Sequence, residues 1–254
     1  MTPDTIAAQL YTIRAFLQEE SQVADSLKRI AEIGFKAVQI SGMKAPLPEA
    51  AVKTICDDLG LTICATHEPG AKIIDETDVV IERLKALGCP YTAYPCPHVP
   101  LDSVDDVKAL AAGLERAAQK MQAAGLGLGY HNHAVEFRRF GDRTALDIIY
   151  EEAPSLIGEI DTFWVQRGGA NPTTWCQRLA GRMPIVHLKD AAMLDDKSTC
   201  AFCEVGSGNL EWPSIIAALR AGGCKWYIIE QDQCPGDPFV SLQQSRDWLV
   251  ANCC

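Results

Sequence analysis

The stretch GLGLGYHNH at residues 125–133 joins the end of a predicted helix to a short apolar strand that ends in two histidines. The segment 101–124 before it is amphipathic and of helical length, and Gly125 is the residue type that most often ends a helix. Residues 126–131 have the length and apolar content of a buried strand. The stretch therefore predicts a helix, a glycine turn and a strand with polar residues at its carboxyl end.

This order of strand and helix recurs eight times along the chain. We expect strands at residues 5–11, 36–40, 61–66, 91–94, 126–131, 156–160, 184–188 and 226–230. We expect helices at residues 21–33, 48–59, 73–87, 101–124, 144–152, 172–179, 212–221 and 239–250. Such regular alternation predicts a parallel sheet with right-handed crossover connections.

Eight units in 254 residues match the size of a closed (β/α)8 TIM barrel. We therefore predict a single α/β barrel domain over residues 1–254, since no linker or charge block divides the chain. The alternative is an open doubly wound sheet. It is less favoured because no G-x-G-x-x-G turn follows the first strand.

Composition excludes several classes of function. With 33 acidic and 23 basic side chains the net charge is −10, which argues against a nucleic-acid partner, because phosphate backbones require a clustered basic surface. No apolar run approaches the ~20 residues of a membrane span, and the N-terminus does not have the pattern of a signal peptide. The eleven cysteines are odd in number and scattered, which favours buried thiols in a reducing compartment. We expect a cytoplasmic protein with no membrane partner.

The exceptional polar residues fall where a barrel collects its chemistry, at the carboxyl ends of the strands. Four of the five histidines are among them. The set consists of His67, His131, His133, Asp161, His187 and Glu230.

Three of these residues follow the sixth, seventh and eighth predicted strands, whose ends are neighbours in a barrel. Asp161, His187 and Glu230 together form a ligand set for a divalent transition metal. A fifth-strand histidine completes the set, and His131 and His133 share the parity that points into the barrel. The alternative without an ion is a carboxylate network neutralised by Lys189 and Arg167.

Seven motifs carry a resemblance that spans nearly the whole chain. They are QLYTIR (9–14), GFKAVQ (34–39), YHNHAVEF (130–137), IDTFW (160–164), HLKD (187–190), VGSGNLEW (205–212) and IIEQD (228–232). In their order and placement the sequence resembles the xylose isomerase-like TIM barrel superfamily, in the branch described as sugar phosphate isomerases/epimerases. Ketose 3-epimerases of this superfamily bind their metal through Glu, Asp, His and Glu on strands five to eight.

The resemblance implies that Asp161, His187 and Glu230 are metal ligands, with Mn, Co, Zn or Mg as the ion. The family's fifth-strand Glu falls at His131, or alternatively at His133, so a two-glutamate epimerase mechanism does not transfer whole. Glu136 occupies the place of a second, substrate-contacting Glu. The superfamily also contains dehydratases acting on keto-inositols, and an abasic-site endonuclease that the net charge of −10 disfavours.

These residues predict proton abstraction beside a metal-bound carbonyl, through an enediolate. The expected activity is isomerisation or epimerisation of a sugar or keto-sugar, with or without a phosphate group, and Glu230, Lys189 and Glu136 are the expected acid–base groups. Dehydration of a keto-inositol or keto-sugar shares the intermediate and remains an alternative. Expected substrate contacts are His67, His133, Trp164, Glu204 and Tyr11, with the long connection 191–211 as a lid.

A second class of function stays open. A sugar-binding barrel without chemistry would keep the cavity but should lack a full ligand set, and a subunit that needs a partner protein would look the same in sequence. The sequence does not indicate an oligomeric state, and the expected partner is a small sugar or cyclitol.

Overall fold

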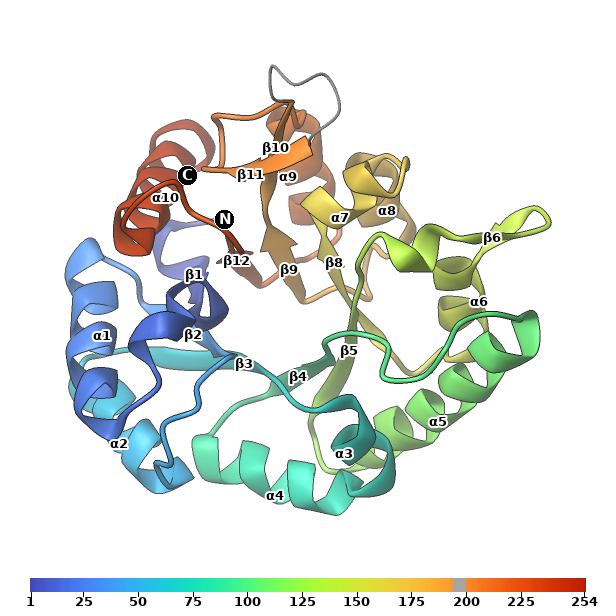
Figure 1. Cartoon of the computed structure of the whole chain (residues 1–254), viewed down its shortest axis with the longest axis horizontal. Helices are drawn as coiled ribbons and strands as arrows, with labels where there is room; N and C mark the ends of the chain where they lie inside the picture. Colours follow the sequence, from blue (N-terminus) through green and yellow to red (C-terminus); the bar gives the residue numbers. More distant parts are fainter. Residues whose placement is uncertain (194–199) are drawn as a thin grey trace.

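Eight parallel strands close into a barrel at the centre of the protein, as predicted. The computed structural model describes residues 1–193 and 200–254. Around the barrel of this described part the strands run in the order β1, β2, β3, β4, β5, β8, β9, β12 and back to β1 (Figure 1). Their bounds are Ile6–Gln9, Ala37–Ile40, Thr62–His67, Tyr91–Tyr94, Gly127–His131, Ile157–Asp161, Ile185–Leu188 and Trp226–Ile229.

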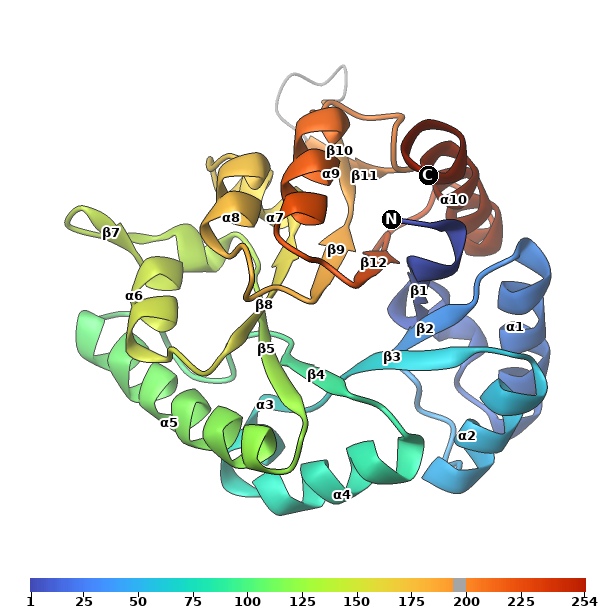
Figure 2. The same ribbon diagram turned by 180° about the vertical axis from the view of Figure 1, so that it is seen from behind.

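Helices surround the barrel on its outside, and the same ring is seen from behind in Figure 2. The α-helices α1 to α10 are Glu20–Ile33, Glu49–Asp58, Gly70–Asp75, Thr77–Leu87, Val104–Ala123, Ala145–Glu152, Thr162–Arg167, Pro172–Arg178, Trp212–Ala221 and Pro238–Cys253. Three 3-10 helices, η1 to η3, span Pro3–Thr5, Leu10–Phe16 and Val135–Phe137.

Local sequence signals fix the ends of these helices. Ser103 begins α5 with a capping box, in which its hydroxyl accepts from the Asp106 N–H and the Asp106 carboxylate accepts from the Ser103 N–H. Gly34 ends α1 in the left-handed conformation, with φ of 105°, that a residue with a side chain rarely adopts. Each strand is therefore followed by a helix whose apolar face packs back onto the barrel.

The register of the strands aligns the polar residues that the sequence singled out. Asp161 on β8 lies opposite His187 on β9, and Ile228 on β12 also lies opposite His187. His131 on β5 lies opposite Glu159 on β8. These pairings bring side chains of four neighbouring strands to one end of the barrel.

The structure differs from the prediction in several places. The strand expected at 5–11 ends at Gln9, whose side chain accepts from the Tyr11 N–H and begins the 3-10 helix η2. The connection after β8 contains the unexpected helix α7, which Asp161 caps by accepting from the Trp164 N–H. The helix expected at 73–87 is two helices, α3 and α4, because Glu76 between them has non-helical dihedrals (φ −125°, ψ 40°). The connection 191–211, predicted as a loop, begins with a hairpin of β10 (Asp190–Met193) and β11 (Cys200–Cys203). A second short hairpin pairs β6 (Arg139–Phe140) with β7 (Arg143–Thr144).

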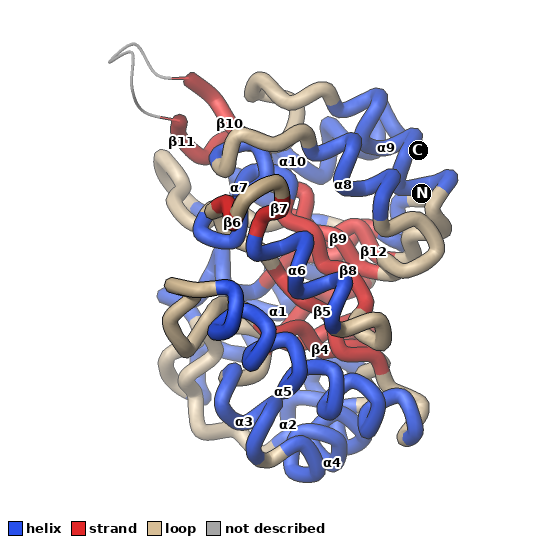
Figure 3. Tube along the Cα trace, turned by 90° about the vertical axis from the view of Figure 1, so that its right-hand side faces the viewer, coloured by secondary structure: helices blue, strands red, loops and turns tan. Residues whose placement is uncertain are grey.

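The β10–β11 hairpin lies on the side of the barrel away from both chain termini (Figure 3). Part of the expected lid, residues 194–199, lies outside the described residues. All eleven cysteines are free thiols. None of the helices in the described part of the chain has the length and apolar character needed to cross a membrane.

Candidate active site

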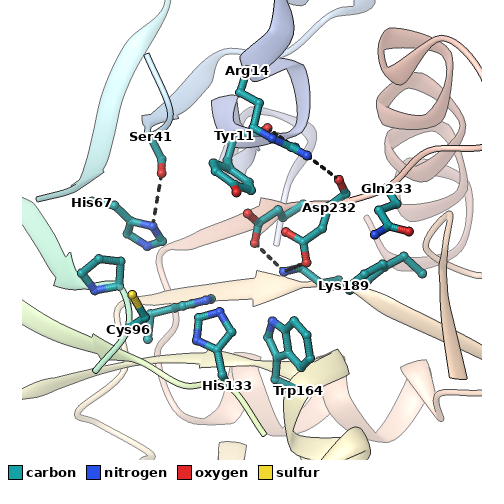
Figure 4. Close-up of a pocket in the computed structure, with 14 residues that line it drawn as sticks. Tyr11, Arg14, Ser41, His67, Cys96, His133, Trp164, Lys189, Asp232 and Gln233 are labelled. Carbon is teal, nitrogen blue, oxygen red and sulfur yellow. Dashed lines mark hydrogen bonds and ion pairs between the residues drawn. The ribbon is translucent and has the colours of Figure 1, made fainter. Parts of the chain in front are cut away.

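A cavity of about 440 Å³ opens at the carboxyl ends of the strands. Five predicted site residues line it together with Lys189 and Glu230 (Figure 4). These five are Tyr11, His67, His131, His133 and Trp164. Phe202 of β11 adds to the aromatic wall, and its ring stacks on Phe163 with 4.1 Å between the centroids. The β10–β11 hairpin, which lies in the connection that we expected to be a loop, therefore contributes to the cavity wall.

The four predicted metal ligands converge beneath this cavity. One ligand atom from each of His131, Asp161, His187 and Glu230 lies within 4.8 Å of the others. His187 Nδ1 is 2.9 Å from Glu230 Oε2 and 3.7 Å from Asp161 Oδ2, and His131 Nε2 is 4.0 Å from Asp161 Oδ2. All four side chains are buried. We call these four residues the mouth set.

Lys189 places an ammonium group against the mouth set. Its Nζ lies 2.7 Å from Glu230 Oε2, 3.0 Å from Asp161 Oδ2 and 3.0 Å from Asp232 Oδ2. Burial alone would lower the pKa of Lys189, but the three carboxylates hold it above its ordinary value. The same contacts keep the pKa of Glu230 below its usual range, against the effect of burial. Lys189 therefore neutralises the carboxylates as the alternative without an ion expected. Arg167, the other residue expected to do so, instead donates to the Cys200 carbonyl oxygen.

The mouth set also fits a divalent cation. Asp161 Oδ2 is buried and accepts no hydrogen bond from any residue that the structure describes, although the ammonium is close. Two imidazole nitrogens and two carboxylates are ligands that Zn²⁺ and Mn²⁺ accept. Burial and the neighbouring histidines His187 and His67 hold the pKa of His131 well below its usual range. A neutral His131 ring has a lone pair for a metal.

A second layer below the mouth set is centred on Glu159, which the sequence analysis missed. Glu159 Oε2 is 2.6 Å from His67 Nε2 and 3.7 Å from His131 Nδ1, and its Oε1 is 3.5 Å from His187 Nε2. Burial would raise the pKa of this carboxyl, but His187 and His67 lower it to about 2. The available signal was strand parity, because Glu159 precedes Asp161 by two residues and so faces the same way.

Asp232 is the second residue that the sequence analysis missed. It follows β12 by three residues, lines the cavity and contacts Lys189. Burial and the nearby Glu230 charge raise its pKa to about 6, although Lys189 acts in the opposite direction. This carboxyl can therefore exist in both protonation states near neutral pH.

Asp161 and His187 lie beneath the cavity without lining it, and two further predicted site residues, Glu136 and Glu204, lie away from it. Glu136 is fully buried, where its two oxygens accept from Tyr130 Oη at 3.0 Å and from the His133 N–H at 2.8 Å. Burial raises its pKa to about 7. Glu204 accepts from Ser241 Oγ on α10 at 2.7 Å. The cavity wall includes neither residue, because each is held by a turn or helix behind it.

The motif around 205–212 has a structural explanation. Asp190 Oδ2 accepts from the N–H groups of Gly206 and Gly208 and from Trp212 Nε1. A Cβ on Gly208 would clash with Asp190, so glycine is needed for this close approach. Asp190 therefore holds the connection after β11 against the end of β9.

Comparison with known proteins agrees with the barrel fold. A family model described as xylose isomerase-like TIM barrel matches residues 27–251. The chain belongs to this family. Among curated members, the rhizopine catabolism protein MocC of Rhizobium meliloti is 23% identical, over 85% of this chain and 76% of that protein. The inosose dehydratase of Lacticaseibacillus casei is 25% identical, over 73% of this chain and 66% of that enzyme, just under two thirds of its length.

Solved structures of this xylose isomerase-like family share the fold. A sugar phosphate isomerase/epimerase from Parabacteroides distasonis superimposes with a TM-score of 0.83 at 20% identity, covering 100% of this chain and 96% of that one. The IolI protein, solved with a bound zinc atom, gives a TM-score of 0.75 at 13% identity, covering 97% of each chain. The predicted family and barrel are confirmed.

Proposed function

We propose that this xylose isomerase-like barrel is a metal-dependent enzyme that removes a proton beside the carbonyl of a small sugar or cyclitol. One observation carries the proposal: Lys189, Glu230 and Asp232 meet in the lining of a cavity whose wall also contains aromatic side chains. Cavities with such convergent acid–base groups are typical of active sites. Similarity to the inosose dehydratase and to a sugar phosphate isomerase/epimerase supports a carbohydrate or cyclitol substrate.

The residues proposed to hold the ion are His131, Asp161, His187 and Glu230, and the zinc in IolI supports a metal in this family. A divalent ion bound there supplies Lewis acidity, which polarises a carbonyl and acidifies the neighbouring C–H. The ion proposed for this site is Mn, Co, Zn or Mg.

The protein's own groups would then move the protons. Glu230 is a carboxylate that lines the cavity, so it is placed to accept the proton from carbon. Lys189 keeps its proton, because its pKa is raised, and its ammonium would stabilise the negative charge that develops on oxygen. Asp232, with a pKa raised to about 6, is suited to deliver a proton to a departing hydroxyl.

The placement of these groups favours dehydration. Glu230, Asp232 and Lys189 all come from β9 and β12 or the residues that follow, and Glu136 on the β5 side does not line the cavity. A two-carboxylate epimerase, with one acid on each face of the substrate, therefore has no second carboxylate from β5. A syn elimination of water needs the acid and the base on the same face of the substrate. Similarity to the inosose dehydratase supports this outcome.

Isomerisation or epimerisation is the second candidate, and His133 is the observation that favours it. This histidine lines the cavity from the end of β5, and burial lowers its pKa, so that the ring is neutral and able to accept a proton. His133 would then serve the face of the substrate away from Glu230.

A product analysis separates the two candidates. The zinc- or manganese-loaded protein is incubated with keto-inositols, ketopentoses and ketohexoses, each with and without phosphate, and followed by NMR. A dehydrated ketone supports the dehydratase, and a new stereoisomer or aldose supports the isomerase. Turnover of none of them, or equal turnover in excess chelator, contradicts the proposal.

A further inference from the structure

We propose that Gln39 and Glu159 act as positioning residues that fix which nitrogen of His187 carries hydrogen, and so direct His187 Nδ1 at the metal. The inference rests on the proposed function, because it concerns the same ion. Gln39 comes from β2 and Glu159 from β8, so the contact crosses the barrel interior below the mouth set.

The direction of each hydrogen bond follows from the chemistry of Glu159. An ionised carboxylate can only accept, and the Gln39 side-chain nitrogen lies 2.7 Å from Glu159 Oε1. Gln39 must therefore present its NH₂ group to Glu159 and its carbonyl oxygen to the other side. That oxygen lies 2.6 Å from His187 Nε2 and accepts from Gln9 Nε2 at 2.9 Å.

The orientation of Gln39 determines the state of His187. Because Gln39 Oε1 has no hydrogen to give, His187 Nε2 must be the donor. The neutral ring then carries its lone pair on Nδ1, which faces Glu230 Oε2 at 2.9 Å and Asp161 Oδ2 at 3.7 Å. Without a metal, His187 Nδ1 also faces an acceptor, Glu230 Oε2, so a cation that binds at the mouth set replaces the hydrogen on Nδ1, while Gln39 keeps the hydrogen on Nε2.

Gln39 Oε1 lies closer to His187 Nε2 than Glu159 Oε1 does, at 2.6 Å against 3.5 Å. Bulk water does not reach the contacts by which Gln39 and Glu159 orient His187, which we call the relay. The side chains involved, and the neighbouring Gln9, are each 0% exposed. The second oxygen of Glu159 is occupied by His67 Nε2 at 2.6 Å. Burial of a carboxylate costs free energy unless its oxygens accept hydrogen bonds. Here the bonds to Glu159 hold Gln39, and through it the proposed metal ligand His187, in one orientation.

Three variants test the relay against general packing. Gln39→Met removes the acceptor that faces His187, and Gln39→Glu restores it, since a carboxyl group protonated toward Glu159 still offers a carbonyl oxygen to His187. Gln9→Met is the matched control, because it removes a buried amide from the same cluster but leaves the Gln39–Glu159 contact intact. Zinc affinity is measured by competition with a chromophoric chelator.

We expect Gln39→Met to bind zinc roughly 10- to 100-fold more weakly, the usual scale for loss of an outer-layer partner of a metal-bound histidine. Gln39→Glu and Gln9→Met should bind like the wild type. Wild-type affinity in Gln39→Met, or an equal loss in Gln9→Met, would overturn the relay.

The tautomer is also read directly by ¹⁵N NMR of the wild-type histidines, which does not depend on any variant folding. With zinc bound, and in the zinc-free protein at alkaline pH, His187 should carry its hydrogen on Nε2. Hydrogen on Nδ1 in the zinc-free neutral ring would overturn the inference. If the wild type shows the Nε2 tautomer but Asp161→Asn does not weaken zinc binding, the proposed metal site fails while the relay stands.

Discussion

The Lys189 ammonium nitrogen lies 2.7 Å from Glu230 Oε2 and 3.0 Å from Asp161 Oδ2, so one side chain contacts two proposed metal ligands. Lys189 is 1% exposed and lines the cavity, and its Nζ lies 5.7 Å from the centre of the Trp164 ring. A buried cation in this position balances carboxylates that would otherwise repel one another. In the proposed reaction it stabilises developing negative charge on oxygen.

Replacing this lysine should therefore separate metal binding from catalysis. We expect Lys189→Met to retain the metal and to slow turnover by roughly 10²-fold or more, the scale for loss of a group that stabilises developing negative charge on oxygen. Metal content is measured by elemental analysis beside kcat. Arg167→Met is a matched control, since Arg167 bonds the Cys200 carbonyl outside the mouth set. Wild-type kcat in Lys189→Met would remove it from the mechanism.

Removal of a proposed metal ligand, in contrast to removal of Lys189, should release the metal. Asp161→Ala deletes a fully buried carboxylate of the mouth set and should abolish stoichiometric metal binding. Asp232→Ala removes a carboxylate that also contacts Lys189 but lies outside that set, and should keep the metal. Elemental analysis of both folded variants decides the assignment. Unchanged metal content in Asp161→Ala would show that the ion, if any, is held elsewhere.

The two fifth-strand histidines should differ in their effect. His131 Nε2 faces Asp161, whereas the His133 ring packs against Trp164 with 5.0 Å between the centroids. We expect His131→Ala to weaken metal affinity more than His133→Ala, which should mainly raise KM. Metal titration and steady-state kinetics on both variants test this order. A larger loss of metal affinity in His133→Ala would transfer the ligand role to His133.

Strand geometry explains which residues of this site could be predicted from the sequence. Asp161, His187 and Glu230 were predicted because each ends an apolar run, and parallel strands bring such ends together. Glu159 lies inside its strand, where a charged residue is unfavourable unless a partner from another strand neutralises or hydrogen-bonds it. Which strands supply those partners is known only from the fold. Parity with Asp161 was the signal that could have marked it.

Other features depended on contacts between distant segments. Glu136 was expected in the site because the family resemblance implies a substrate-contacting Glu there, and Glu204 because it lies in the long connection 191–211. The chain turns after β5 and after β11 direct both side chains away from the cavity. The β10–β11 hairpin forms by pairing across a connection whose sequence contains no glycine or proline to mark a turn. The break at Glu76 has no glycine or proline beside it.

The buried Glu136 makes a prediction about stability and pH. Its folded pKa is raised to about 7, above the ordinary 4.5, so the folded state holds a proton that the unfolded chain releases. The resulting stability is present below about pH 4.5 and is lost as pH rises through 7. Glu136→Gln should remove this dependence, so that the wild type loses up to about 3 kcal/mol relative to the variant between pH 5 and 8.

Urea unfolding of both proteins at pH 5 and pH 8 measures that difference. Because Glu136 does not line the cavity, Glu136→Gln should also keep most of its turnover. A folded Glu136→Gln protein that has lost turnover by 10²-fold would return this residue to the acid–base role that its position in the sequence suggested.

The most direct test of the central claim is the appearance of solvent deuterium in the substrate. Candidate keto-sugars and keto-inositols are incubated in D₂O with the metal-loaded protein, and C–H exchange beside the carbonyl is followed by NMR. Proton abstraction predicts exchange at that carbon with the wild type, strong slowing with Glu230→Gln and Lys189→Met, and none with excess chelator. Turnover that resists the chelator, proceeds at full rate in Lys189→Met and leaves the substrate carbon without deuterium would contradict the account.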